Sequence, residues 1–123
     1  MKRNMFLIIA AVVYAIFGLA ILFVPVEFVR NFGVNLAGGA VALARVFGAH
    51  LVGAAVILGL SRDDALKGTL KNVLAGNAIY NAIAIIIAVY AIQNGLVNSL
   101  GWWLVLIHAL LAAGFGYFWN RKR

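Results

Sequence analysis

Residues 38–60 form an apolar run that is long enough to cross a lipid bilayer as one helix. At about 1.5 Å per residue the run extends roughly 35 Å, and the hydrocarbon core of a bilayer is about 30 Å thick. The run also contains Arg45 and His50. A charge at the centre of a bilayer costs at least about 2.5 kcal/mol. We therefore expect a membrane-spanning helix in which both side chains face protein or trapped water.

Three further apolar runs occupy most of the remaining chain, at residues 5–24, 70–93 and 100–119. Hydrophobic residues make up 66% of the sequence and charged residues 11%, whereas soluble domains average about half and about a quarter. The connection from Asn94 to Ser99 is short, which makes the last two runs an antiparallel pair. The sequence therefore predicts a single all-α membrane domain over residues 1–123, a four-helix antiparallel transmembrane bundle.

The segment from Val26 to Ala37 separates the first two predicted spans and is too polar to cross the membrane. Its apolar residues Phe28, Val29 and Phe32 recur at a spacing that places them on one side of a helix, and Gly33 interrupts the pattern. Such a short amphipathic segment is typical of a helix that lies in the membrane interface. We expect a short interfacial helix between spans 1 and 2.

Lysine and arginine are distributed unequally over the two sides that alternating spans create. One side receives only Arg30, and the other receives Lys2, Arg3, Arg62, Lys67, Lys71, Arg121, Lys122 and Arg123. Because basic loops remain in the cytoplasm, both termini are expected there, in a multi-pass protein of the cell membrane, that is the inner or plasma membrane. Topology and anionic headgroups explain the net charge of +7, so the predicted partner is the lipid bilayer and not nucleic acid.

Polar side chains are rare within the predicted spans, and several occur near the middle of their own run. Alternating spans bring the central ones to similar depth, and two asparagines share one face of the third span. The candidate ligand-binding residues are Tyr14, Arg45, His50, Asn77, Asn81 and His108. Arg45 requires an acceptor, for which Glu27, helix-end carbonyls or the head of a ligand are the candidates.

Three interpretations of these residues remain open. The first is a hydrogen-bonded network that only fixes how the helices pack. The second is a pocket, open to the bilayer, for a lipid-like molecule or a quinone, with Arg45 at its polar head. The third is a bis-histidine haem b electron-transfer subunit, with His50 and His108 as the axial ligands.

Residue types that catalysis needs are scarce. The chain has no cysteine, which excludes disulfides, thiolate nucleophiles and iron–sulfur ligation by its own thiols. Its three acids, Glu27, Asp63 and Asp64, lie outside the predicted spans, so the embedded carboxylate of small multidrug exchangers is missing. We predict a non-enzymatic protein without catalytic or metal-binding residues and without a cofactor, with haem b or quinone as the alternatives.

Small residues in the spans indicate helix association. Rows such as Ala55 and Gly59, one turn apart, are suited to close packing, and so small a bundle cannot bury every such row. We therefore expect a homo-oligomer or a subunit of a larger membrane complex.

The second span contains the run Arg45-Val46-Phe47-Gly48-Ala49 after a glycine-rich entry, and the first span ends near Pro25. In these features and in its four spans the whole chain resembles the DoxX-like group of small four-helix membrane proteins. Arg45 and Gly48 match the pattern. Some members of that group are associated with quinone-linked oxidation, so the resemblance implies a quinone or lipid ligand and implies no catalytic residue.

Overall fold

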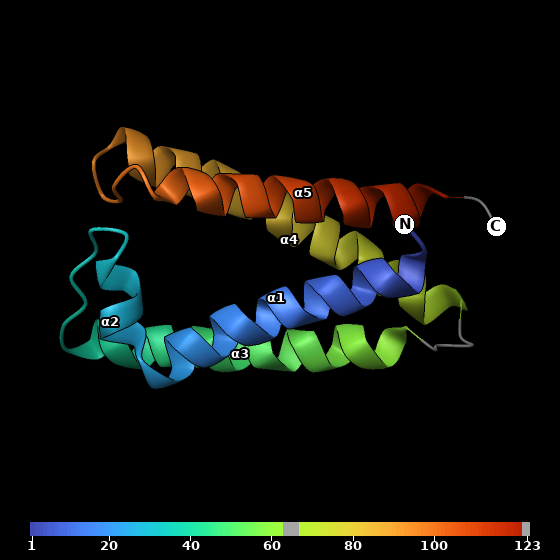
Figure 1. Cartoon of the computed structure of the whole chain (residues 1–123), viewed down its shortest axis with the longest axis horizontal. Coiled ribbons are helices and arrows are strands. Elements are labelled where there is room, and N and C mark those ends of the chain that lie inside the picture. Colours follow the sequence, from blue (N-terminus) through green and yellow to red (C-terminus); the bar gives the residue numbers. More distant parts are fainter. Residues whose placement is uncertain (63–66, 122–123) are drawn as a thin grey trace. The chain divides into compact units, whose positions relative to one another are not determined.

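The computed structural model describes residues 1–62 and 67–121 of the chain. These residues form five helices and no strand (Figure 1): α1 (Arg3–Phe23), α2 (Pro25–Arg30), α3 (Gly39–Ser61), α4 (Lys67–Gln93) and α5 (Gly101–Asn120). The predicted all-α class is confirmed, with four long apolar helices and a short helix between the first two.

The helices α1, α3, α4 and α5 are each long and apolar enough to cross a membrane. Each bound lies within three residues of the predicted one, because the length of the apolar run sets where a spanning helix begins and ends. Every one of the four exposes large hydrophobic side chains, for example Ile16, Leu43, Ile86 and Leu110. Exposed apolar surface on this scale is typical of a multi-pass membrane protein.

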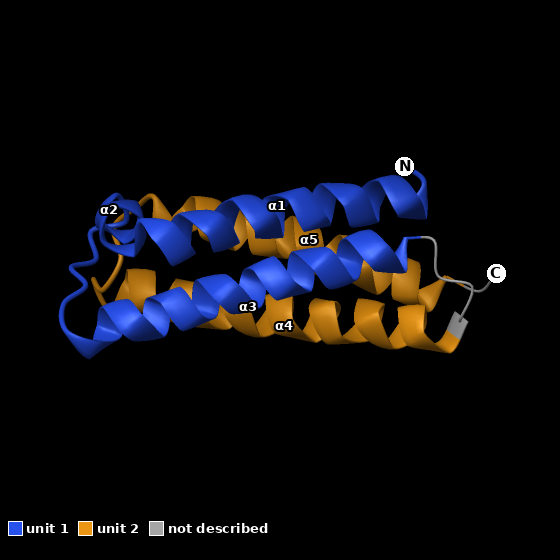
Figure 2. Cartoon of the chain, turned by 90° about the horizontal axis from the view of Figure 1, so that it is seen from below, with its two compact units in different colours: residues 1–62 blue, residues 63–123 orange. Residues whose placement is uncertain are grey.

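The helices pack as two compact units, each an antiparallel hairpin (Figure 2). Unit 1 is Met1–Arg62 and contains α1, α2 and α3, whereas unit 2 is Asp63–Arg123 and contains α4 and α5. That both units form one transmembrane domain stays a prediction.

In unit 1, α1 and α3 approach so closely at Gly18 and Gly48 that neither position has room for a side chain. A Cβ on Gly48 would lie 2.6 Å from the backbone nitrogen of Leu22 and 2.8 Å from the carbonyl oxygen of Gly18. A Cβ on Gly18 would lie 2.9 Å from the backbone nitrogen of Val52. The two helices therefore meet backbone against backbone, which is how small residues promote helix association in membranes.

The buried residues of α3 follow the same face as Gly48, at intervals of three and four residues. They are Gly48, Leu51, Ala55, Leu58 and Ser61. Ala55 is only 7% exposed, so the expectation that its row is open to a second copy is wrong at this position. Ala55 belongs to the packed face, whereas a Cβ on Gly59 would meet nothing within 4 Å, so Gly59 lies outside the close contact.

The break between α1 and α2 is made by proline. Pro25 has no backbone N–H to donate to α1, so α1 ends at Phe23 and Val24 leaves the helical conformation. Pro25 then occupies the first position of α2, where a missing N–H costs nothing. The chain therefore changes direction at the place where it is expected to leave the membrane.

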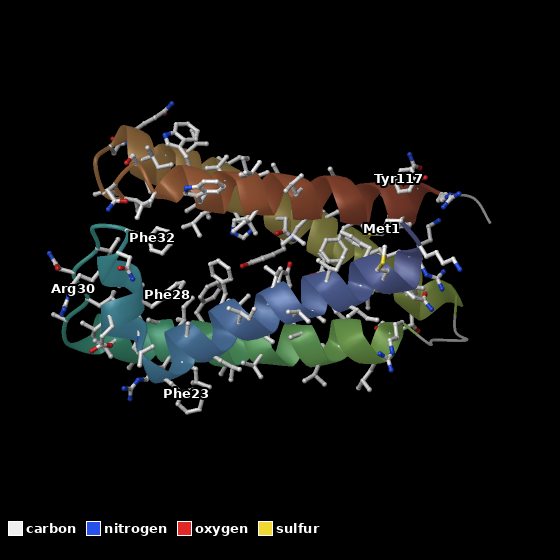
Figure 3. All side chains as sticks on the ribbon, viewed as in Figure 1. Met1, Phe23, Phe28, Arg30, Phe32 and Tyr117 are labelled. Carbon is white, nitrogen blue, oxygen red and sulfur yellow. The ribbon has the colours of Figure 1, made fainter. Side chains whose placement is uncertain are left out.

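Aromatic rings hold the short helix α2 against α1. The ring of Phe28 contacts that of Phe17 edge-on at 5.6 Å between centroids, and the ring of Phe32 at the same separation. Phe28 on α2 and Phe32 in the turn after it point to the same side, and Arg30 points to the other (Figure 3). The helix is followed by a turn in which Gly33 has φ 77°. These features match the predicted short helix, and its position in the interface stays a prediction.

In unit 2, a tight turn joins α4 to α5. Gly95 adopts φ 68°, and the amide of Leu96 donates to the carbonyl of Ala91 at 2.9 Å, which closes the end of α4. The side chain of Asn98 accepts a hydrogen bond from the amide of Leu100 at 3.0 Å, just before α5 begins. The turn thus fixes α5 antiparallel to α4, as the sequence predicts.

Basic residues gather at one end of each hairpin. In unit 1 they flank the start of α1 and the end of α3, and Arg30 lies at the opposite end. In unit 2 they lie near the start of α4 and after α5. The described ones at these ends are Lys2, Arg3, Arg62, Lys71 and Arg121. Asp63, Asp64, Lys122 and Arg123, which the sequence analysis also uses, lie outside the described residues.

Candidate functional site

The packed face of α5 is apolar except for one histidine. Gly101, Leu111, Phe115 and Phe118 are buried, and His108 lies half-buried in the same register of three- and four-residue intervals. The histidine is about 10 Å along the helix from the start of α5. At that depth its ring nitrogens must find partners within the protein or in a ligand.

Two asparagines on α4 hydrogen-bond back to their own helix. The Asn77 Nδ2 donates to the carbonyl of Val73 at 2.9 Å, and the Asn81 Nδ2 donates to the carbonyl of Asn77 at 2.7 Å. Short polar side chains often return to a carbonyl four residues earlier when no water is available. This bond satisfies the amide nitrogen of Asn81 and leaves its oxygen for a partner on the other helix.

That partner is His108. Its Nδ1 donates to the Oδ1 of Asn81 across the helix pair at 2.8 Å, and Asn81 is completely buried. The ring of Tyr80 meets the imidazole edge-on, with 6.0 Å between ring centroids. We call Asn77, Tyr80, Asn81 and His108 the polar cluster. It joins α4 to α5 with a hydrogen bond and an aromatic contact in an otherwise apolar hairpin.

The three remaining predicted site residues belong to unit 1 and do not form a cluster there. Tyr14 is buried in α1, at 4% exposed, whereas Arg45 and His50 are exposed on α3. Five residues at about 100° each place Arg45 and His50 about 140° apart around their helix. Neither is buried on the face that carries Gly48, so the packing of α1 against α3 encloses neither of them. That both face protein or trapped water stays a prediction.

Arg45 makes no ion pair or hydrogen bond with any residue that the structure describes, and Glu27, one of its three candidate acceptors, is exposed. The backbone of Arg45 lies about 9 Å along the helix from the start of α3, and its long side chain can extend toward that end. Within unit 1, therefore, no bonded partner fixes the side chain of Arg45.

Haem would require axial ligands from both units, because His50 lies on α3 and His108 on α5. Within residues 1–62 and 67–121, no group of three or more histidine, cysteine or acidic side chains could hold a metal ion. The polar cluster offers a hydrogen bond across the helix pair and an aromatic edge.

Tyr80 is the member of the polar cluster that sequence reasoning missed. It follows Asn77 by three residues and precedes Ala84 by four, so it lies at the edge of the asparagine stripe. That spacing was available in the sequence. The contact between Tyr80 and His108 depends on the rotation of α5 about its axis, which only the structure shows.

Comparison with protein-family models, with curated proteins and with solved structures gives no match for this chain.

Proposed function

We propose that the chain is a small integral membrane protein that binds a lipid-like or quinone-type amphiphile through the polar cluster of unit 2. The observation that carries the proposal is the hydrogen bond between Asn81 and His108, inside a hairpin whose other buried residues are mostly apolar. A histidine at this depth is costly unless it is bonded, and such residues in membrane spans usually mark sites of function.

The chemistry of the cluster fits an amphiphile that enters from the bilayer. His108 offers a polar atom, and Tyr80 places an aromatic edge beside it. The apolar side chains around them suit a hydrocarbon tail or a substituted ring. The resemblance to the DoxX-like group supports the same ligand class. That Tyr14, Arg45 and His50 bind a ligand stays a separate proposal for unit 1, in which Arg45 is suited to a polar head.

The proposal is tested on the full chain in lipid nanodiscs. The bound lipids and quinones are extracted and identified by mass spectrometry, for the native protein and for His108→Gln. We expect a distinct molecule to be enriched over the nanodisc lipid and lost in the variant. Asn94→Ala is the control, because Asn94 also bonds a carbonyl four residues earlier but lies exposed. A lipid profile that is the same in all three proteins would show that the cluster binds nothing.

A purely structural role is the competing function, and the same cross-helix hydrogen bond favours it. In that case His108→Gln lowers the stability of the protein and changes no bound molecule. The haem alternative has a direct test of its own: absence of a Soret band after expression with added haem removes it.

We also propose that both termini are cytoplasmic and that the membrane is the inner or plasma membrane, since the basic ends of the hairpins carry most of the positive charge. Because the chain has no cysteine, one introduced cysteine can be labelled without background. A membrane-impermeant reagent added to intact cells should label Ser99→Cys and not Lys2→Cys. Labelling of Lys2→Cys alone reverses the orientation.

Self-association is proposed as well, through the small residues Ala49 and Gly53, which remain exposed on α3. Native mass spectrometry should detect dimers or larger assemblies in mild detergents. Monomers alone in every detergent would contradict it.

A further inference from the structure

The hydrogen bonds around Asn81 determine which nitrogen of His108 carries a proton. The carbonyl oxygen of Asn77 can only accept, so the Asn81 atom 2.7 Å from it is the NH₂ group. The other end of the Asn81 amide is therefore its oxygen, and it lies 2.8 Å from the Nδ1 of His108. An amide oxygen can only accept as well, so the hydrogen between them belongs to Nδ1.

A neutral imidazole carries one N–H, and its second nitrogen then has a lone pair. In His108 that second nitrogen is Nε2. It makes no hydrogen bond with any described residue, and it is not enclosed by the protein, because it is not among the fully buried atoms that lack a partner. The hairpin therefore presents one accessible hydrogen-bond acceptor at a depth where water is scarce.

We propose that the Nε2 of His108 accepts a hydrogen bond from a hydroxyl group, so that the site prefers an amphiphile with a free O–H to the same molecule without one. This inference rests on the proposed function and specifies its ligand class. A carbonyl or ether oxygen would bring a lone pair against the lone pair of Nε2, whereas a hydroxyl supplies the missing proton. The hydroxyl can come from a hydroquinone or from a glycerolipid with a free alcohol.

The first measurement is the protonation of His108 in the unliganded full chain. Nitrogen-15 NMR of histidine-labelled protein in nanodiscs separates protonated from unprotonated ring nitrogens, and the signals that disappear in His108→Gln assign the residue. We expect a protonated Nδ1 and an unprotonated Nε2. A protonated Nε2 with a bare Nδ1 overturns the inference, whatever the protein binds.

The second measurement compares matched pairs of probes. One pair is an alkyl hydroquinone and its dimethyl ether, and the other is a diacylglycerol and its acetylated form. We expect one alcohol to bind about ten-fold more tightly than its blocked partner, as one hydrogen bond made or missing allows. Which pair shows the difference identifies the source of the hydroxyl.

Failure of this inference is distinguishable from failure of the proposed function. Equal or tighter binding of the blocked probe in both pairs overturns the hydroxyl preference and leaves a binding site. Absence of binding by every probe overturns both. Asn81→Ala removes the acceptor that fixes the proton on Nδ1, so the preference should fall to about two-fold or less, while Asn94→Ala should retain it. Retention of the full preference in Asn81→Ala would overturn the mechanism.

Discussion

The two hairpins of this protein are closed by different chemistry. In unit 1, Gly18 and Gly48 bring two backbones into direct contact, and no side chain lies between them. In unit 2, Asn81 and His108 join the helices by a hydrogen bond between side chains. Since lipid is as apolar as leucine, helix pairs in a membrane depend on close packing and on polar contacts, and each hairpin relies on one of them.

The difference matters because the two kinds of contact leave different groups accessible to a ligand. The glycine contact uses all the space at the crossing and exposes no reactive group. The polar contact uses one nitrogen of His108 and leaves the other accessible. For this reason the proposed ligand site lies in unit 2, and substitutions in the two hairpins should have different consequences.

The largest effect is expected from Gly48→Ala, which should lower the free energy of unfolding by about 2–3 kcal/mol. The added Cβ would press on backbone atoms of α1, which cannot rotate away. Gly53→Ala and Gly59→Ala on the same helix meet nothing within 4 Å, so they should leave stability unchanged or raise it by up to about 1 kcal/mol. Unfolding of the purified protein from mild micelles with sodium dodecyl sulfate measures all three. Equal free energies of unfolding for the three variants would show that the contact between Gly18 and Gly48 does not stabilise unit 1.

Asn81→Ala should cost about 1.5 kcal/mol, because it leaves the Nδ1–H of His108 without its acceptor in unit 2. Asn94→Ala is the matched control and should cost less than about 0.5 kcal/mol, since Asn94 bonds only its own helix at an exposed site. The same denaturant titration compares them. A cost for Asn94→Ala as large as that for Asn81→Ala would show that the bond within the helix dominates, and not the cross-helix one.

Gly101→Ala sharpens the contrast between the hairpins and should cost about 1 kcal/mol. A Cβ there would lie 2.7 Å from the Cγ1 of Val97 and 2.9 Å from the Cγ1 of Ile92, which are side-chain atoms that can move. Val97→Ala combined with Gly101→Ala should recover part of the loss, as a thermal melt can detect. No comparable rescue is expected for Gly48→Ala. If Gly101→Ala loses as much stability as Gly48→Ala, the side chains around Gly101 yield no more easily than the backbone around Gly48.

The smallest effect on stability is expected at Arg45. Arg45→Ala should change the free energy of unfolding by less than about 0.5 kcal/mol, because the side chain is exposed and has no bonded partner among the described residues. If Arg45 holds the head of a ligand, the co-purified molecule is lost while the fold persists, and Arg45→Lys restores part of it. A large loss of folding yield in Arg45→Ala would reveal a structural partner instead.

The helices were predictable and their rotations were not. Apolar length alone places the bounds of α3 and α5 within a residue of the expected ones, and Pro25 marks the break after α1. Sequence spacing also puts Asn77 and Asn81 on one face. The pairing of Asn81 with His108 depends on the rotation of α5 about its own axis relative to α4. The sequence does not specify that rotation, because the surfaces of the helices are almost uniformly apolar.

Arg45 and His50 show the limit most clearly. The cost of polar groups in lipid predicts that both face protein or trapped water, but it does not say which side of α3 packs on α1, and in unit 1 that side carries Gly48 and the other buried residues of the helix. The close backbone approach leaves no room for a side chain at Gly48, and Leu51, Ala55 and Leu58 fill most of the rest of that side. A cost argument can say that a side chain needs a partner, but the space at the crossing decides where the side chain lies.

The closeness of Gly18 and Gly48 along the chain has a consequence for how the protein is made. Only residues 19–47 separate the two glycines, and the partners of the second hairpin are separated by even fewer residues. The first pair of helices can therefore complete its crossing before the ribosome has finished the second pair. Membrane insertion can thus proceed two helices at a time, with the boundary between the two units after Arg62.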